Sequence, residues 1–368
     1  MTNESRYMGR AIALAWRGQG HVEPNPMVGC VIVKNGRVVG EGYHRRFGGP
    51  HAERMALAAA GRRSRGATLY VTLEPCCHFG KTPPCVDAII RAGVRRVVAA
   101  VRDPNPLVAG KGLARLRRAG IKVEVGLMKP EAEQLAAPFI VCQTLGRPYV
   151  ILKWAQSIDG KIATRSGDSR WITSIESRRM AHALRARVDA IVVGVDTVLA
   201  DDPELTARWV RPKRVATRVV LDSRFRTPLS SRLVRSARRV PTLVVGAKSP
   251  ASAGRRRRLE SAGCQVLPMP VDATGIDLAR LLCVLREMGM TNVLVEGGGK
   301  ALGGFVEARL ADEAVVFVGP KLIGGETAPG PLRHRGPRLM RDLPAVEIAR
   351  ISHIGHDLCY DMRFSRSK

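Results

Sequence analysis

Three cysteines and a histidine lie within the twelve residues of the stretch EPCCHFGKTPPC, residues 74–85. His51 and Glu53 precede this stretch as a His-x-Glu pair, and Cys76 follows them in a Pro-Cys pair. Imidazole and thiolate are ligands that zinc prefers, and a hydrolytic zinc site needs about three protein ligands and one open position for water. A glutamate that does not bind the metal can then carry protons, as in zinc deaminases. The residue types and their spacing therefore predict a catalytic zinc site.

If His51 is one of the three ligands, four side chains in this stretch compete for the two remaining ligand positions. Cys76 ends a predicted strand, and Cys85 begins a predicted helix, whose N-terminus favours the thiolate that a metal requires. Cys77 is expected to point away, because neighbouring side chains diverge, and His78 is a candidate for substrate contact. The alternative is a structural site closed by four ligands, which would have no use for the nearby glutamate.

The formal net charge of +28 at pH 7 is the most unusual bulk property of the 368 residues. Such a charge could bind the phosphate backbone of a nucleic acid. However, aromatic residues make up only 4% of the chain, so platforms for stacking single-stranded bases are scarce. We therefore predict solvated basic faces and no nucleic-acid partner. A nucleic-acid base deaminase is the alternative function, and it leaves the residues from about 147 onward without a role.

The cysteine content and the N-terminal residues indicate in which cellular compartment the protein is expected. Eight cysteines in a chain of this length do not form a disulfide framework. The first twenty residues lack the apolar stretch and cleavage site of a secretory signal, and no run approaches the eighteen or so apolar residues of a membrane helix. We expect a cytoplasmic protein with no membrane partner.

Strands and helices alternate over residues 1–146 and would position the zinc ligands. Residues 25–44 read as a hairpin with an Asn35-Gly36 turn. Pro50 precedes a helical pattern, and Met8, Ala11, Ile12 and Ala15 have helical spacing near the N-terminus. Further strand and helix patterns follow in turn, within residues 67–75, 83–94, 95–101 and 113–127. This alternation predicts a layered α/β domain with a mixed sheet.

A second domain is predicted from residue 147 to 368, after the break near QTLGRP. Its apolar, β-rich runs, such as those beginning at Pro148, Asp189 and Asn292, favour a buried and largely parallel sheet. Residues 293–310 read as a strand, a glycine-rich turn and a helix. Glycine allows close backbone approach, and a helix N-terminus offers N–H groups to a diphosphate. The spacing is not that of a Rossmann GxGxxG turn.

Several stretches together resemble one family over nearly the whole chain. They are PNPMVG (24–29), GYH (42–44), PHAE (50–53), TLEPCCHFGKTPPC (72–85) and DPNPLVAGKG (103–112). These stretches are similar to those of the bifunctional riboflavin-biosynthesis deaminase/reductase family. The resemblance implies an N-terminal cytidine-deaminase-like three-layer αβα domain with a mixed sheet and a C-terminal dihydrofolate-reductase-like α/β domain.

For the first domain, the resemblance places the zinc ligands on His51, Cys76 and Cys85 and the proton shuttle on Glu53. It places a pyrimidine contact on Asn25, whose amide can both donate and accept hydrogen bonds. The implied reaction is the hydrolytic deamination of 2,5-diamino-6-ribosylamino-4(3H)-pyrimidinone 5′-phosphate. Lys81 is a candidate for contact with that phosphate.

For the second domain, the resemblance implies reduction of the ribosyl chain of 5-amino-6-(5-phosphoribosylamino)uracil by NADPH. Residues 153–173 and 197–208 carry the likeness there, beside the glycine-rich turn. The implied substrate contacts are Ser169, Arg185, Leu205, Arg208 and Glu296. Arg185 and Arg208 have the fork geometry and permanent charge expected for a substrate phosphate. Lys153 is a further candidate, for a hydrogen bond to the opened sugar. The implied cofactor contacts are Ala155, Trp171, Thr197, Asp201, Ser223, Gly298, Gly299, Lys300, Ala301, Leu302, Gly303 and Gly304. The partners expected are small pyrimidine ribose phosphates, and the chain is expected to form a homo-oligomer.

Overall fold

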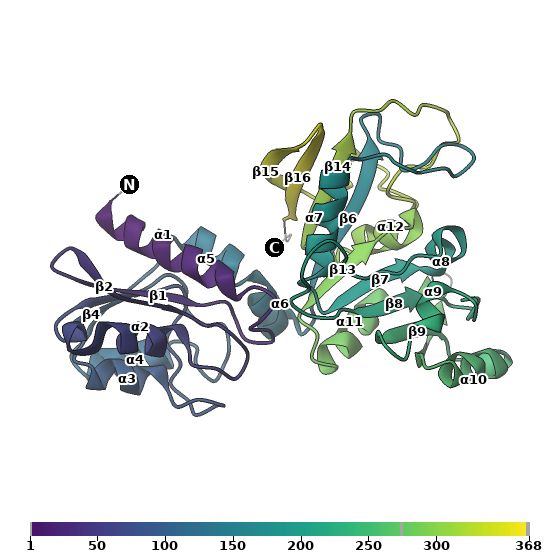
Figure 1. The fold of residues 1–368 in the computed structure, drawn as a ribbon. Helices are drawn as coiled ribbons and strands as arrows, with labels where there is room; N and C mark the ends of the chain where they lie inside the picture. The colour runs from purple at the N-terminus through teal and green to yellow at the C-terminus, as the bar shows by residue number, and fades with distance from the viewer. Residues whose placement is uncertain (1, 273–274, 366–368) are drawn as a thin grey trace. The chain divides into compact units, whose positions relative to one another are not determined.

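The computed structural model describes residues 2–272 and 275–365 (Figure 1). The chain divides into two compact units, Met1–Arg147 and Pro148–Lys368. Across the described ranges, none of the helices combines the length and the apolar character that crossing a bilayer requires.

The N-terminal unit contains a five-stranded sheet in the order β2-β1-β3-β4-β5. Its strands are β1 (Gly29–Lys34), β2 (Arg37–Tyr43), β3 (Thr68–Val71), β4 (Arg96–Ala99) and β5 (Lys122–Val125). Strand β1 pairs antiparallel with β2 and β3, whereas β3, β4 and β5 run parallel. The sheet is therefore mixed, as predicted.

The β1–β2 hairpin turns at the Asn-Gly pair. Asn35 and Gly36 both have positive φ, 50° and 75°. Two consecutive residues with positive φ form the tight turn whose twist matches that of the two strands, and Asn-Gly is the pair that adopts it most readily. The predicted hairpin is confirmed.

Helices cover both faces of this sheet. They are α1 (Asn3–Ala15), α2 (Ala52–Ala60), α3 (Cys85–Arg91), α4 (Lys111–Arg118), α5 (Lys129–Leu135) and α6 (Ala137–Leu145). Helix α1 buries the four apolar residues whose spacing predicted it. It packs with α5 against one face, while α2, α3 and α4 pack against the other (Figure 1). The side chains of β1 alternate between these two cores, which gives the three-layer arrangement.

Helix α2 lies unusually close to strand β2. A Cβ at Gly40 would come within 2.3 Å of the Ala56 carbonyl oxygen, and one at Gly42 within 2.4 Å of the Ala52 oxygen. Any side chain at these positions would push the helix away. The two glycines therefore fix the start of α2, which carries His51 and Glu53.

The C-terminal unit contains a nine-stranded sheet in the order β10-β9-β8-β7-β13-β6-β14-β16-β15. Its strands are β6 (Tyr149–Ser157), β7 (Ala190–Gly194), β8 (Thr217–Leu221), β9 (Thr242–Ala247), β10 (Gln265–Met269), β13 (Asn292–Glu296), β14 (Glu313–Gly319), β15 (Val346–Ile354) and β16 (Asp357–Phe364). All pairings from β10 to β14 are parallel, and the β15–β16 hairpin is antiparallel. The largely parallel sheet is as predicted, and the hairpin is an addition that the sequence analysis did not include. A two-stranded ladder joins β11 (Val271–Asp272) to β12 (Gly275–Ile276).

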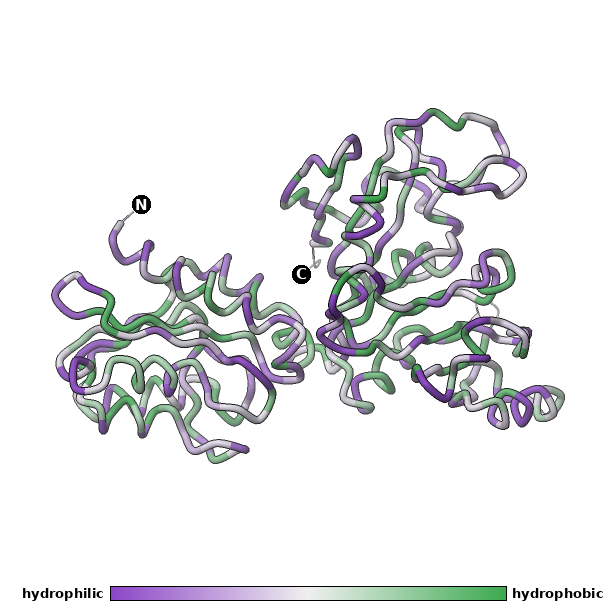
Figure 2. Tube along the Cα trace, in the orientation of Figure 1, coloured by the Kyte–Doolittle hydropathy of each residue, from purple (hydrophilic) through white to green (hydrophobic). Residues whose placement is uncertain are grey.

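The helices of this unit are α7 (Ile175–Arg185), α8 (Val195–Asp201), α9 (Arg232–Arg235), α10 (Ala253–Ser261), α11 (Leu278–Glu287) and α12 (Gly299–Glu307). Short 3-10 turns occupy Trp16–Gly18, Gly61–Ser64, Pro250–Ser252 and Met340–Asp342 along the chain. Helices α11 and α12 pack on the central strands in the largest apolar cluster. Helix α10 buries only Leu259, and Figure 2 shows it largely hydrophilic. The arginine run in α10 is therefore a solvated face.

Candidate functional site

The three predicted zinc ligands lie together in the N-terminal unit. His51 precedes α2, Cys76 follows β3, and Cys85 begins α3. The His51 Nδ1 lies 3.5 Å from the Cys76 Sγ and 3.4 Å from the Cys85 Sγ, and the three atoms lie within 4.8 Å of one another. Tetrahedral zinc with its usual bond lengths would separate neighbouring ligand atoms by about 3.5 Å. The donor set and its spacing fit a zinc ion.

Neighbouring groups orient these ligands. The Cys85 backbone N–H donates to the Cys76 Sγ over 3.3 Å, and the Thr82 Oγ1 lies 3.3 Å from the His51 Nε2. With Nδ1 facing the thiols, Nε2–H donates to Thr82, which fixes the tautomer that a metal requires. A hydrogen bond from the Cys85 thiol lowers the pKa of Cys76 to about 4, although burial opposes it. The site therefore favours a thiolate.

Cys77 and His78 lie outside this cluster. The Cys77 thiol faces the Leu107 carbonyl oxygen, 3.8 Å away, on the far side from the ligands. His78 instead lines the cavity beside them. The expectation that Cys77 points away from the ligands agrees with this geometry.

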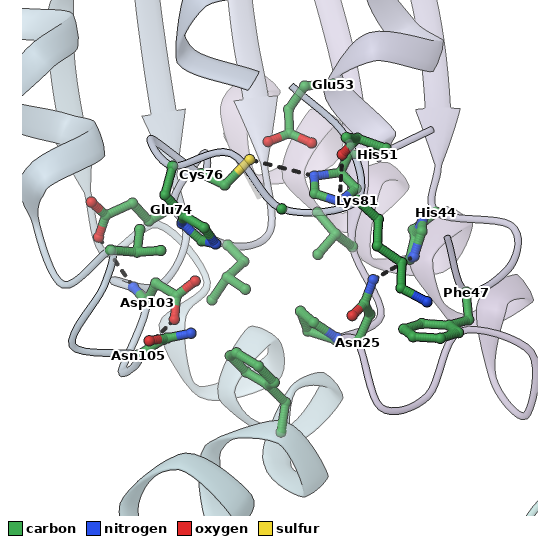
Figure 3. A pocket seen from close by; sticks show the side chains of 18 of the residues that line it. Asn25, His44, Phe47, His51, Glu53, Glu74, Cys76, Lys81, Asp103 and Asn105 are labelled. Carbon is green, nitrogen blue, oxygen red and sulfur yellow. Dashed lines mark hydrogen bonds between the residues drawn. The ribbon is translucent and has the colours of Figure 1, made fainter. Parts of the chain in front are cut away.

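A cavity of about 330 Å³ opens beside the cluster, and two of the three ligands, His51 and Cys76, line it. Figure 3 shows Glu53, His51 and Cys76 at one side of it and Asn25, His44 and Lys81 at another. Burial, and then the Cys76 thiolate, raise the pKa of Glu53 to about 7. A carboxyl group with that pKa can both accept and release a proton near neutral pH.

Asn25 is oriented by His44, which the sequence analysis did not single out. The His44 Nδ1 lies 3.1 Å from the Pro50 carbonyl oxygen, and its Nε2 lies 3.2 Å from the Asn25 Nδ2. Because a carbonyl only accepts, Nδ1 carries the proton and Nε2 accepts from the Asn25 amide. Burial lowers the pKa of His44, which keeps the ring neutral. The Asn25 Oδ1 is thereby left to face the cavity as an acceptor (Figure 3).

Lys81 and Phe47 form one wall of the cavity. The Lys81 Nζ lies 4.0 Å from the centre of the Phe47 ring, a cation–π contact. Both side chains line the cavity, so the ammonium group is held at its edge. This placement is compatible with the predicted phosphate contact of Lys81, which stays a prediction.

Glu74 is a buried acid that the sequence analysis missed. Its carboxylate is only 3% exposed. The two oxygens accept four backbone N–H bonds of 2.9–3.2 Å, from Asp103, Gly110, Gly112 and Leu113. One side chain thus ties the segment after β3 to two residues of the loop before α4 and to the first turn of α4. The available signal was an acid at the end of an apolar strand, followed later by a loop rich in glycine and proline.

The loop that Glu74 holds presents Asp103 and Asn105 to the cavity. The Asp103 Oδ1 accepts the Asn105 backbone N–H over 2.8 Å, and the Asn105 Oδ1 accepts that of Leu107 over 3.0 Å. Burial raises the pKa of Asp103 to about 6. These turns leave the Asn105 amide nitrogen directed towards the cavity (Figure 3).

In the C-terminal unit, three predicted substrate contacts meet beside the sheet. Lys153 and Glu296 are register partners on β6 and β13. Arg185 donates to Glu296 through Nε at 2.8 Å and Nη2 at 2.6 Å, and the side chains of the two are only 15% and 6% exposed. Burial alone would raise the pKa of Glu296, but the charge and hydrogen bonds of Arg185 lower it to about 2. The fork of Arg185, expected to face a phosphate, here faces this carboxylate.

Aromatic and basic side chains stack next to Arg185. The Arg178 guanidinium lies 4.0 Å from the centre of the Trp171 ring and 5.8 Å from that of Trp209. The ring of Trp209 in turn contacts that of His182 edge-on, with centres 4.8 Å apart. Trp171, a predicted cofactor contact, therefore belongs to an exposed stack of aromatic and basic groups.

The glycine-rich turn after β13 has the geometry of a diphosphate site. Gly297 and Gly298 have φ of 71° and 77°. A Cβ at Gly298 would come within 2.8 Å of the Thr197 Oγ1, and one at Gly299 within 2.6 Å of the Arg333 side chain. Among the described residues, no side chain caps α12, so its first N–H groups are available to a ligand. Contacts with Thr197 and Arg333 thus require the glycines, and the diphosphate contact stays a prediction.

The remaining predicted residues are distributed along the same unit. Ala155 lies on β6, Asp201 ends α8, and Ser223 follows β8. Three more lie in loops: Ser169, the buried Leu205, and Arg208, which pairs with Glu204. Their roles at the site stay predictions.

Two family descriptions match the chain. "Cytidine and deoxycytidylate deaminase zinc-binding region" matches residues 1–101, and "RibD C-terminal domain" matches residues 148–360. The first range includes all three clustered ligands, and the second covers more than half of the chain.

Curated relatives and solved structures are similar over almost the full length. The chain is 45% identical to "Riboflavin biosynthesis protein RibD" of Aquifex aeolicus over 96% of this chain and 97% of that protein. It is 44% identical to the Escherichia coli protein of the same name, over 96% and 97%. The structure of Acinetobacter baumannii RibD matches with a TM-score of 0.86 at 36% identity over 99% of both chains. A Thermotoga maritima structure described as a diaminohydroxyphosphoribosylaminopyrimidine deaminase/5-amino-6-(5-phosphoribosylamino)uracil reductase matches with a TM-score of 0.83, also at 36% identity over 99% of both chains.

Proposed function

The chain belongs to the RibD family of riboflavin biosynthesis proteins, and on this premise we propose which residues carry its two activities. It is a bifunctional enzyme that combines a zinc-dependent deaminase with an NADPH-dependent reductase. The proposed substrates are 2,5-diamino-6-ribosylamino-4(3H)-pyrimidinone 5′-phosphate for the deaminase and 5-amino-6-(5-phosphoribosylamino)uracil for the reductase.

The deaminase assignment depends on one observation, the clustering of His51, Cys76 and Cys85 beside a cavity that also contains Glu53. A zinc ion held by these three ligands supplies the Lewis acidity that makes water nucleophilic at neutral pH. Glu53 takes one proton of the attacking water and delivers it to the ring nitrogen; it then takes the hydroxyl proton of the tetrahedral adduct and delivers it to the amine, which leaves as ammonia while the carbonyl forms. The raised pKa of Glu53 supports this shuttle, because the group can be reprotonated near pH 7.

Other cavity residues orient the pyrimidine. The Asn25 Oδ1, fixed by His44, offers an acceptor to an N–H on the edge of the base. We assign the phosphate to Lys81, whose ammonium group is at the cavity edge. These contacts would hold the amine-bearing carbon next to the three ligands and exclude other orientations of the ring.

The reductase assignment rests on the glycine-rich turn and on the group of charged residues beside it. NADPH supplies the hydride when it is bound. The N–H groups at the start of α12, which no side chain among the described residues caps, bind its diphosphate. Lys153 and Glu296 lie beside the reacting ribose in this proposal, and Lys153 donates a hydrogen bond to the opened sugar. Ring opening comes first, because hydride needs an electrophilic carbon.

Arg185 keeps Glu296 ionised in this proposal. Its two hydrogen bonds hold the carboxylate in one orientation and neutralise a charge that would otherwise be unpaired in a buried position. A permanently charged acceptor is then available to the sugar hydroxyls at every physiological pH.

A cytoplasmic location belongs to the same proposal. The two ligand cysteines must stay reduced to bind metal, and a reducing compartment preserves them. Homo-oligomer formation and the lack of a nucleic-acid partner stay predictions.

The test is an assay of the full chain with the diaminopyrimidinone phosphate, following ammonia release and NADPH oxidation separately. We expect His51→Ala to lose zinc and to slow ammonia release by more than about 100-fold, since even second-shell changes at metal sites cost 10–100-fold. NADPH oxidation should persist when deaminated substrate is supplied. Normal ammonia release from a zinc-free variant would contradict the deaminase assignment.

A further inference from the structure

A second cavity, of about 360 Å³, opens in the C-terminal unit between the loop after β8 and helix α10. Three arginines line it, Arg226 from the loop and Arg255 and Arg258 from the helix, together with Thr227. No carboxylate is among its lining residues. The cavity is therefore strongly electropositive.

This cavity lies at the edge of the sheet where a dinucleotide is expected. Strands β7, β8, β9 and β13 are parallel, so the segments that follow them meet at one edge. Ligands of open α/β sheets bind outside the carboxyl ends of the strands. The loop after β8 contains Ser223, already predicted to contact the cofactor, and reaches the cavity two residues later, at Phe225.

One carboxylate links the cavity to the glycine-rich turn. The Asp196 Oδ1 lies 2.7 Å from the Arg226 Nη2, and its Oδ2 lies 3.1 Å from the Nζ of Lys300 in the first turn of α12. Arg226 and Lys300 are thus separated by a single carboxylate group. This carboxylate connects the predicted diphosphate site at α12 to the cavity.

The side chains of the cavity suit a dianion. Guanidinium groups bind phosphate through paired N–H donors, which is the geometry that Arg226, Arg255 and Arg258 can offer. Within residues 2–272 and 275–365, Arg255 and Arg258 form no ion pair; Arg255 donates instead to the Arg224 carbonyl oxygen over 3.0 Å, which ties α10 to the loop. Two acids lie near the cavity. Asp196 is offset by its two cationic partners, and the Asp222 Oδ2 accepts hydrogen bonds of 2.7 Å from the Thr227 N–H and Oγ1.

We propose that this cavity holds the 2′-phosphate of NADPH, and that Arg226 and Arg255 set the preference for NADPH over NADH. The inference rests on the proposed reductase function and assigns the part of the cofactor that distinguishes the two nucleotides. The arginines of the cavity could also bind free phosphate. The probes below therefore include inorganic phosphate beside two nucleotides that differ only in the 2′-phosphate.

Binding of nucleotide fragments tests the proposal without hydride transfer. The full chain is titrated calorimetrically with adenosine 2′,5′-bisphosphate, with AMP and with inorganic phosphate. We expect the bisphosphate to bind at least about tenfold more tightly than AMP, because hydrogen bonds between charged groups are worth that much or more. Arg226→Ala and Arg255→Ala should each remove most of this ratio and change the AMP affinity far less. Tighter binding of free phosphate than of the bisphosphate would overturn the assignment.

Arg257→Ala is the matched control. Arg257 lies on the same helix and is exposed like Arg255, but it does not line the cavity. Arg257→Ala removes the same positive charge as Arg255→Ala, so an effect of the overall electrostatic field would appear equally in these two variants. We expect the bisphosphate-to-AMP ratio of Arg257→Ala to stay near that of the unaltered chain. An equal loss in both variants would overturn the proposal.

Steady-state kinetics separates this inference from the function on which it rests. The ratio of kcat/KM for NADPH to that for NADH should fall about tenfold or more in Arg226→Ala and Arg255→Ala. An unchanged ratio in a chain that still oxidises NADPH would overturn the cavity assignment and leave the reductase function in place. No oxidation of either nucleotide by the unaltered chain would overturn both.

Discussion

The two units each contain a buried glutamate at their candidate site, and the pKa values of the two carboxyl groups are shifted in opposite directions. Burial and the thiolate of Cys76 raise the pKa of Glu53 to about 7. Glu296 is as deeply buried, yet Arg185 lowers its pKa to about 2. The neighbour therefore decides the chemistry of the carboxyl group. Glu53 is suited to moving protons, and Glu296 is suited to binding with a fixed charge.

The two sites also differ in how far apart along the chain their residues lie. His51 and Cys85 are 34 positions apart, and both are at the start of a helix. Arg185 and Glu296 are 111 positions apart and meet only because β13 is inserted between β6 and β7. A compact motif thus marks the first site, whereas the second is assembled by the order of the strands.

Replacing Glu53 should give the largest change in activity, and the effect should be confined to the deaminase reaction of the first unit. Glu53→Gln keeps the shape but cannot carry a proton, so ammonia release should fall about 10²–10⁴-fold. Zinc content and NADPH oxidation with deaminated substrate should be unaffected. The measurement is ammonia release together with metal analysis, and loss of zinc from this variant would mean that Glu53 is needed for binding the metal.

Breaking the ion pair between Arg185 and Glu296 should lower the stability of the second unit only. Arg185→Met leaves the Glu296 charge buried without its partner, which costs about 3–5 kcal/mol of stability. The double variant Arg185→Met/Glu296→Gln should recover part of that loss, because no uncompensated charge remains. Urea unfolding followed by tryptophan fluorescence measures this, since three of the four tryptophans lie beyond residue 147. Equal stability of the single and double variants would contradict the pairing.

The pH dependence of stability should show the sign of the Glu296 shift. Its pKa falls from 4.5 to about 2 on folding, so the stabilisation is present above about pH 4.5 and disappears as pH falls towards 2. The shift corresponds to about 3 kcal/mol at neutral pH. The difference in unfolding free energy between the unaltered chain and Glu296→Gln should therefore shrink from pH 6 to pH 3. A constant difference would contradict the lowered pKa.

Glu74→Gln should have a smaller effect, located in the first unit. The amide has one acceptor oxygen in place of two and turns an N–H₂ group towards backbone N–H donors, which costs about 1–3 kcal/mol. Because the loop with Asp103 and Asn105 loosens, KM for the pyrimidine should rise more than kcat falls. Deaminase kinetics with zinc content as the control tests this. A change in kcat alone would mean that Glu74 acts on the metal ligands.

The smallest effect is expected from Cys77→Ser. Its thiol faces Leu107 and not the ligand cluster, so ammonia release and zinc content should stay within about twofold. Cys85→Ser is the matched variant, because it makes the same exchange of sulfur for oxygen at a ligand and should lose zinc. Loss of zinc from both would place Cys77 in the metal site.

The sequence alone determined the features that depend on neighbours along the chain. An Asn35-Gly36 pair between apolar strands forms its turn from local backbone preferences. The buried stripe of α1 follows from helical spacing, and the candidate ligands follow from a motif of residue types. These signals involve few residues and short separations, so the amino-acid order carries them.

The tertiary structure decided which distant groups meet. Nothing local to Glu74 shows that four N–H groups 29 to 39 positions later will surround its carboxylate. Nothing local to Arg185 shows that its fork will face Glu296. The hairpin of β15 and β16 was missed for a related reason, since β15 is mostly exposed and buries none of its residues fully. Burial and strand order set the charge, orientation and partners of these groups, and both arise only when the sheet is assembled.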